Sequence, residues 1–260
     1  MKKLIYLIYL LPLFVLHSCT DDAGTFDSSG SVSDAGGNVT GTGGSLARFT
    51  IMGDKLYTIN NTDLKTFDLS DKNNPIYVSR TPIGIGIETI FPYNGHLFIG
   101  SQLGMYIFDA TSSPESPVKI SEYEHVFSCD PVVVQGNYAY VTLRSGFGPC
   151  GRNVSELQII DISNYSNPFL TNQVFMDGPK GLGVDGNRLF VCDATNLMFF
   201  DISSPVNPEY LRDYDIVAND VIPLKDKKVL LVLADDALYQ YDYADENLPL
   251  LSKLSIIPPA

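Results

Sequence analysis

The chain has 260 residues, 45% of them apolar, which is enough to bury a sizeable core in one or two domains. Thirty acidic residues oppose 17 basic ones. The resulting net charge of −13 argues against binding to nucleic acid or to anionic membrane surfaces. Such a charge favours cations, basic partners or neutral ligands such as sugars.

The N-terminus has the pattern of a signal peptide. Lys2 and Lys3 precede an apolar run over residues 4–16, which is too short to span a bilayer. The run ends in Leu16-His17-Ser18-Cys19, which resembles the lipobox of bacterial lipoproteins, although His is a less usual middle residue. We therefore predict a lipoprotein signal peptide over residues 1–18 and acylation of Cys19. The alternative is an ordinary secretory signal with a Cys there by chance.

Residues 19–44 contain the lipidated Cys19 and a stretch rich in Gly, Ser, Thr and Asp, which predicts a flexible tether. Asp21 and Asp22 resemble the acidic signal that directs lipoproteins to the cell surface in some Gram-negative lineages. A generic acidic linker is the alternative. We expect a lipid-anchored outer-membrane protein facing the cell exterior, with the periplasmic face as the second possibility.

One element recurs five times in residues 45–260. It is an apolar or aromatic residue followed by Asp, a short polar stretch and Pro. The successive intervals between the aspartates are 41, 52, 40 and 41 residues: Asp68, Asp109, Asp161, Asp201 and Asp242. A turn containing Gly lies about fifteen residues upstream of most of these aspartates. In the fifth unit Lys227-Lys228 takes that place.

Each unit contains four short runs rich in Val, Ile, Tyr and Phe. In the second unit these are Ile87–Tyr93, His96–Gly100, Met105–Asp109 and Val118–Tyr123. Four strands in about 43 residues are typical of propeller blades. The sequence therefore predicts an all-β, five-bladed β-propeller of four-stranded antiparallel blades, with six blades or an incompletely closed ring as alternatives. A solenoid is disfavoured because solenoid repeats are usually shorter or have a different Leu and Asn pattern.

Two of the units resemble a known family. Gln158-Ile159-Ile160-Asp161-Ile162-Ser163 and Met198-Phe199-Phe200-Asp201-Ile202-Ser203, each followed by a polar stretch and Pro, are similar to the LVIVD repeat of bacterial surface proteins. The resemblance extends over nearly everything beyond the tether. It implies a β-propeller and very little about activity. The fifth unit departs most, with Tyr243-Ala244 in place of Ile-Ser.

The innermost strand of each blade should begin at the end of the ring where the second strand turns into the third, an end that we call the top. Glu88, Asp130, Lys180 and Asp220 lie at the start of these strands in units two to five. Converging on the central channel, they are candidates for binding a cation or the hydroxyls of a sugar. The alternative is a solvated rim in which Lys180 balances the carboxylates.

The third unit is longer than the others because of its second turn, around residues 145–155. Arg144, Phe147 and Arg152 make this loop basic and aromatic, so it is a candidate partner-binding loop or a tolerated insertion. Since Cys129 and Cys150 belong to the same end of this blade, we predict a disulfide between them, with Cys192 left free. Reduced, buried thiols are the alternative.

Catalysis has little support in the sequence. His96 and His125 have no metal-ligand spacing, and motifs for phosphate loops or nucleophile elbows are missing. We assign no catalytic or metal-binding residue and expect no cofactor. The preferred hypothesis is a non-enzymatic binding or scaffold module, with a glycan or protein ligand and the membrane as partners. The alternative is a carbohydrate-active enzyme using Glu88, Asp130 and Asp220.

Overall fold

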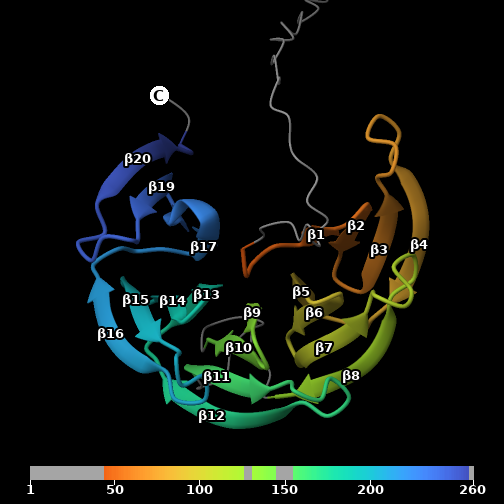
Figure 1. Cartoon of the computed structure of the whole chain (residues 1–260), viewed down its shortest axis with the longest axis horizontal. Helices are drawn as coiled ribbons and strands as arrows, with labels where there is room; N and C mark the ends of the chain where they lie inside the picture. The colour runs from red at the N-terminus through yellow and green to blue at the C-terminus, as the bar shows by residue number, and fades with distance from the viewer. Residues whose placement is uncertain (1–43, 126–130, 145–154, 258–260) are drawn as a thin grey trace, which may run out of the picture. The chain divides into compact units, whose positions relative to one another are not determined.

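The computed structural model describes residues 44–125, 131–144 and 155–257. It contains five antiparallel sheets, each of four strands in sequence order. The sheets are arranged side by side as blades around a common centre (Figure 1). The prediction of an all-β, five-bladed propeller is therefore confirmed. Among these residues no helix is long and apolar enough to cross a membrane.

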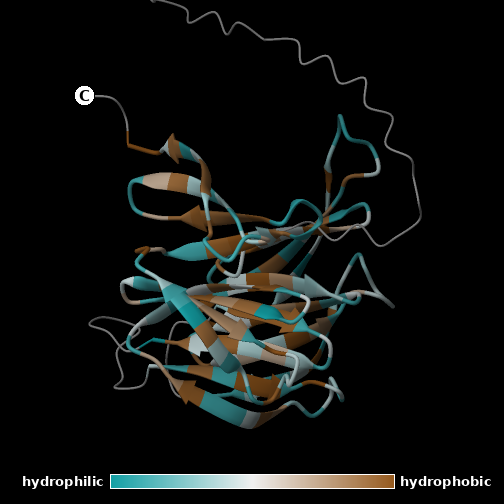
Figure 2. Ribbon diagram, turned by 60° about the vertical axis from the view of Figure 1, so that its left-hand side comes forward, coloured by the Kyte–Doolittle hydropathy of each residue, from teal (hydrophilic) through white to brown (hydrophobic). Residues whose placement is uncertain are grey.

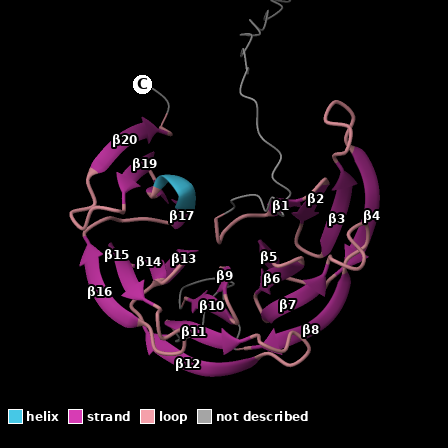
Figure 3. Ribbon diagram, viewed as in Figure 1, coloured by secondary structure: helices cyan, strands magenta, loops and turns pink. Residues whose placement is uncertain are grey.

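The strands of the first three blades are β1 (Phe49–Met52), β2 (Lys55–Ile59), β3 (Asp63–Asp68) and β4 (Ile76–Pro82); β5 (Ile87–Tyr93), β6 (His96–Ser101), β7 (Gly104–Asp109) and β8 (Val118–Glu124); and β9 (Val132–Gln135), β10 (Tyr138–Leu143), β11 (Glu156–Asp161) and β12 (Phe169–Phe175). Those of the last two are β13 (Pro179–Asp185), β14 (Arg188–Asp193), β15 (Asn196–Asp201) and β16 (Glu209–Tyr214); and β17 (Asp220–Leu224), β18 (Val229–Leu233), β19 (Ala237–Asp242) and β20 (Leu250–Ser255). A single 3₁₀ turn, η1 (Lys225–Lys227), precedes β18 in the described part of the chain (Figure 3).

The recurring aspartate stabilises the same turn in every blade. In all five units its carboxylate accepts the backbone N–H of the residue two positions later, at 2.6–2.9 Å. This is an Asx turn, which fixes the chain as it leaves the third strand. The residue after each Asp then donates its N–H to a carbonyl of the turn between the first two strands, at 2.7–3.0 Å. The repeat motif therefore ties together the two turns at the bottom of each blade.

Neighbouring blades pack through large side chains of the second strand. Tyr57 and Tyr140 are buried against the following blade, where their hydroxyls donate to the carbonyls of Pro114 and Pro205 at 2.7 and 3.3 Å. Hydrophobic and hydrophilic residues alternate along many strands (Figure 2), as the pleat of a half-buried strand requires. In blades two to five, the loop that ends in this Pro thus receives the aromatic residue of the preceding blade.

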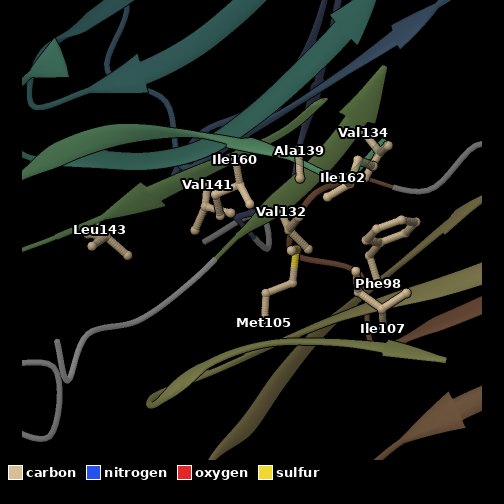
Figure 4. Close-up of a cluster of buried hydrophobic side chains, with 10 residues drawn as sticks. All are labelled: Phe98, Met105, Ile107, Val132, Val134, Ala139, Val141, Leu143, Ile160 and Ile162. Carbon is tan, nitrogen blue, oxygen red and sulfur yellow. The ribbon is translucent and has the colours of Figure 1, made fainter. Parts of the chain in front are cut away.

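Four buried hydrophobic clusters join the blades that follow one another in sequence. Figure 4 shows the cluster between the second and third blades, where Phe98 and Met105 lie opposite Val132 and Ile162. Burial of a single Leu or Phe side chain contributes about 1.5–3 kcal/mol, so these interfaces are the main source of stability. Each of blades two, three and four is covered on both faces.

The first and fifth blades meet differently. No fifth cluster joins them within the described residues, and Figure 1 shows the two blades separated along most of their length. They are connected near the centre by the segment Gly44–Ala47, which bonds to Asp220 of β17 and, through the Ala47 carbonyl, to the N–H of Ile90 at 2.9 Å. The hydrogen bonds that join the fifth blade to the start of the first blade lie in this central segment.

We predict that Asp161→Ala destabilises the domain because the N–H of Ser163, 2.8 Å from the Asp161 carboxylate, loses its acceptor. The expected cost is about 1 kcal/mol in the free energy of unfolding. Urea denaturation of the two proteins measures it. Asp161→Asn retains the acceptor and serves as the control; an equal loss in both variants would contradict the role given to the turn.

Candidate functional site

The top of the ring is assembled as the topology predicts. The turn after each second strand meets the connection leading into the first strand of the same blade. Gln102 N–H donates to Gly86 O at 3.0 Å, Ala194 N–H to Gly178 O at 3.1 Å, and Asn219 N–H to Leu233 O at 2.7 Å. We call this surface the top face. Its described residues are 44–47, 60–62, 83–88, 102–103, 175–180, 194–195, 215–220 and 234–236.

Three of the four rim candidates are described by the structure, and they belong to separate hydrogen-bond groups. Glu88 accepts from Gln102 Nε2 at 3.0 Å within the second blade. Lys180 Nζ donates to Asn219 Oδ1 at 2.9 Å, and Asn219 in turn donates to Asp235. None of the hydrogen bonds described for Glu88, Lys180 and Asp220 joins two of these three residues. Their role in ligand binding stays a prediction.

Asp220 is the centre of a clasp between the chain's N-terminal segment and blades four and five. Its Oδ1 accepts from the Ser45 hydroxyl at 2.9 Å, and its Oδ2 accepts from the Leu46 N–H at 3.4 Å. The Ser45 oxygen accepts the N–H of Leu182 on β13 at 2.8 Å. One serine therefore joins β13 and β17 to the segment that leads into β1.

Two glycines make this clasp possible. A Cβ at Gly44 or at Gly181 would lie 2.2 Å from a carboxylate oxygen of Asp220. Gly181 also brings β13 within hydrogen-bond distance of β17, with its N–H 2.9 Å from Asn219 O. The resulting enclosure leaves Asp220 only 6% exposed, and burial raises the pKa of its carboxyl to about 6.

The remaining sequence candidates divide into two groups. One group lies outside the described residues: Asp130, Phe147, Arg152 and the proposed disulfide partners Cys129 and Cys150. Arg144, by contrast, is described and is half-buried directly after β10. Cys192 is a free thiol, fully buried, and this burial raises its pKa. Within the described ranges no group of His, Cys, Asp or Glu could hold a metal ion.

Exposed hydrophobic side chains distinguish the two ends of the ring, a feature that sequence reasoning missed. At the top, described connections that lead into first strands present them, the most exposed side chains being Phe175 at 80% and Ile85 at 68%, whereas the turns at 60–62, 194–195 and 234–236 present none. The others at this end are Leu46, Leu103 and Val217, followed by Ile256 and Ile257 beyond β20. In the described turns at the bottom, between first and second or third and fourth strands, no large hydrophobic residue is exposed. At this end the exposed hydrophobic side chains instead begin the outer strands, at 51–58% exposure: Ile76, Val118, Phe169 and Leu250.

This asymmetry could have been found from the sequence in part. Ile85 and Val217 occupy connections between predicted strands, where polar residues are the usual choice. A large apolar residue in such a position is exposed unless a partner covers it. The ring-wide distribution needed the structure, because Phe175 ends a strand and only the fold shows to which end it points.

The architecture defines the chain as a β-propeller, and solved structures agree. A functionally unknown protein from Desulfotomaculum acetoxidans aligns over 78% of this chain and 69% of its own, with TM-score 0.61 and 13% identity. Periplasmic gluconolactonase PpgL of Pseudomonas aeruginosa aligns over 78% of this chain and 67% of its own, with TM-score 0.56 and 14% identity. BamB of Moraxella catarrhalis aligns over 79% of this chain and 62% of its own, with TM-score 0.51 and 13% identity. The chain thus spans about two thirds of these structures, and the similarity shows the fold.

Part of the chain matches a known repeat of this fold. The LVIVD repeat model matches residues 128–148, 150–175 and 180–216. All five blades are built on the same Asx turn, and the LVIVD repeats lie in the third and fourth of them. A comparison with curated proteins gives no match.

We predict that Asp220 makes folding dependent on pH. Since its folded pKa of about 6 exceeds the unfolded value, its contribution is fully present below about pH 4 and is lost as the pH rises through 6. The shift corresponds to about 3 kcal/mol between these limits. Urea unfolding at pH 4.5 and 7.5 should show this loss in the wild type, and Asp220→Asn should remove it.

Asp177→Asn is the matched control, because Asp177 is an exposed carboxylate on the same face. The wild-type pH dependence should persist in this variant. If Asp220→Asn and Asp177→Asn change the pH dependence equally, the clasp is not its source.

Proposed function

We propose that this chain is a lipid-anchored protein of the cell envelope, facing the cell exterior, and that its propeller is a non-enzymatic module that binds a partner through the top face. The observation that carries the proposal is the concentration of exposed hydrophobic side chains on the turns and connections of that face. Loops on a rigid scaffold are the usual carriers of binding function. The bottom turns are instead occupied by the Asx turns that hold the blades together.

The exposed side chains favour a protein as the partner. Phe175 and Ile85 are large, project from separate blades and lie on the same face as polar groups such as Asn219 and Asp235. Anchoring apolar residues within a polar surround is typical of protein-binding surfaces. We also propose that a Cys129–Cys150 disulfide fixes the long loop of the third blade at this face, since an exterior compartment permits it.

The envelope location is supported by the N-terminal pattern. A charged n-region, a short apolar run and Cys19 at the end of a lipobox-like motif are the features that exported lipoproteins need. Acyl chains on Cys19 would provide stable anchoring, since each buried CH₂ contributes about 0.8 kcal/mol. One of the solved structures with the same fold is a periplasmic protein, which is consistent with this compartment.

An enzymatic role is less well supported. Asp220, one of the carboxylates considered for acid–base chemistry, is 6% exposed, and both of its oxygens accept hydrogen bonds from the segment at Ser45 and Leu46. A substrate would have to displace that segment to reach the carboxylate. The structure therefore favours binding over catalysis at the rim.

The anchor is tested by replacing Cys19. We expect Cys19→Ser to leave the membrane fraction and to lose incorporation of a labelled fatty acid, because the thiol is the acylation site. Fractionation and metabolic labelling of cells producing the two proteins measure this. Cys192→Ser is the control, since that thiol is buried. A Cys19→Ser protein that stays labelled and membrane-bound would contradict the anchor.

The binding face is tested by placing a photoreactive amino acid at Phe175 or Val217 in the full chain and irradiating intact cells. We expect a discrete protein adduct from both positions. Phe169 and Val118 are control positions of the same residue types, 51% and 58% exposed at the start of outer strands, and should give none. Equal adducts from all four sites, or turnover of a panel of glycans and sugar lactones by the purified chain, would contradict the proposal.

A further inference from the structure

The face of the fifth blade that points away from the fourth has no neighbour. In the other blades the third residue of the second strand packs into the following blade: Tyr57, Phe98, Tyr140 and Phe190 are all 0–1% exposed. The corresponding residue of β18 is Leu231, which is half-buried. The second residue of the third strand shows the same difference between the blades. Met105, Leu157 and Leu197 are fully buried, whereas Leu238 is half-buried.

The outer strand shows the same difference. In blades one to four, the outer-strand residue that pairs with the second residue of the third strand is half-buried, because the following blade covers it. These residues are Thr81, Tyr123, Val174 and Tyr214. Their counterpart on β20 is Leu254, which is paired with Leu238 and 65% exposed. Every residue of β20 is exposed, unlike those of the four other outer strands.

A polar contact repeats between blades and is missing here. On the outer strands of blades one to three, Ser79, Ser121 and Asn172 donate to a loop carbonyl of the following blade at 2.5–2.8 Å. Arg212 makes the same contact from the fourth blade at 3.3 Å. The equivalent residue of β20, Ser252, is exposed and has no such acceptor among the described residues. The fifth blade thus presents half of an interface that the chain completes four times elsewhere.

Four leucines form a continuous apolar area on this face, which we call the blade-five patch: Leu231, Leu233, Leu238 and Leu254. The register places Leu233, Leu238 and Leu254 in one row across β18, β19 and β20, with Leu231 two residues from Leu233 on the same side. The free edge of β20 adjoins the patch, and an exposed apolar edge is a template for pairing with another strand.

The patch is uncharged in an acidic protein, and so is most of its edge. The one charged residue of β20, Lys253, is paired with Asp236 at 2.7 Å. A second copy of the chain, also with net charge −13, would be repelled over most of its surface, but not here. Since the same area is present on both copies, it can pair with itself about a two-fold axis, the commonest symmetry of soluble oligomers.

We propose that two copies of the chain associate through the edge of β20, with the two β20 strands antiparallel and the two-fold axis at Leu254. Leu254 then lies directly opposite Leu254 of the second copy, an apolar cross-strand pair that brings the two blade-five patches together on one face. The same register sets Lys253 opposite Ser255, so that the two ammonium groups are not directly opposed. This association concerns a different surface from the top face and does not depend on the proposed function.

The full chain, purified in detergent, is tested by sedimentation over a range of concentrations. We expect a concentration-dependent dimer. Leu254→Lys would set two ammonium groups against each other on the axis and should raise the dimer dissociation constant more than about tenfold. Phe169→Lys is the matched control, because it has similar exposure on β12, another outer strand without charge, whose patch-equivalent face is covered by the fourth blade.

A second measurement is independent of how Leu254→Lys folds. Leu254→Cys should form a disulfide between copies under mild oxidation, because the register brings its two Cβ atoms to about 5 Å. Ser252→Cys is the control on the same strand. Its two thiols would lie two residues on either side of the axis, about 13 Å apart, and should give only the wild-type background.

Two results would overturn the proposal. One is a chain that is monomeric at all concentrations. The other is a dimer that neither forms the Leu254→Cys crosslink nor responds to Leu254→Lys.

Discussion

A four-stranded blade has two apolar faces, and each must be covered by another blade. This constraint determines most of the molecule: the aromatic residue in the second strand enters the following blade, and the loop ending in Pro receives it. The Asx turn holds that loop in place from within its own blade. Because each blade supplies one half of two interfaces, stability is shared between neighbours, as in other repeat proteins.

The same constraint creates a problem at the two ends of the chain. The first and fifth blades each lack one neighbour, and their unpartnered faces differ. The first blade has Thr58 and Lys65 at positions where other blades have buried or half-buried apolar residues such as Ile99 and Tyr106, which reduces its need for cover. The fifth blade keeps leucines. The clasp of Ser45 on Asp220 joins the ends only near the centre, at the cost of burying a carboxylate.

Function and stability are separated between the two ends of the ring. The bottom turns carry the repeat's aspartates and glycines, whose geometry is nearly the same in every blade. The top turns and connections carry the described rim residues and exposed hydrophobic side chains. Structures with this fold include proteins with enzyme names and one of unknown function, so the fold alone does not select an activity. The surface of the top face has to supply it.

The sequence by itself determined the fold class, the blade count and the strands, because the motif of Asp, turn and Pro repeats and each strand has a period of two. It also placed Glu88, Lys180 and Asp220 at the top, since strand direction alternates regularly. Only the tertiary structure decided that Asp220 is enclosed by Ser45, that Lys180 bonds Asn219, and that Leu254 lacks a neighbour. These facts depend on contacts between residues far apart in the chain, which local patterns do not encode.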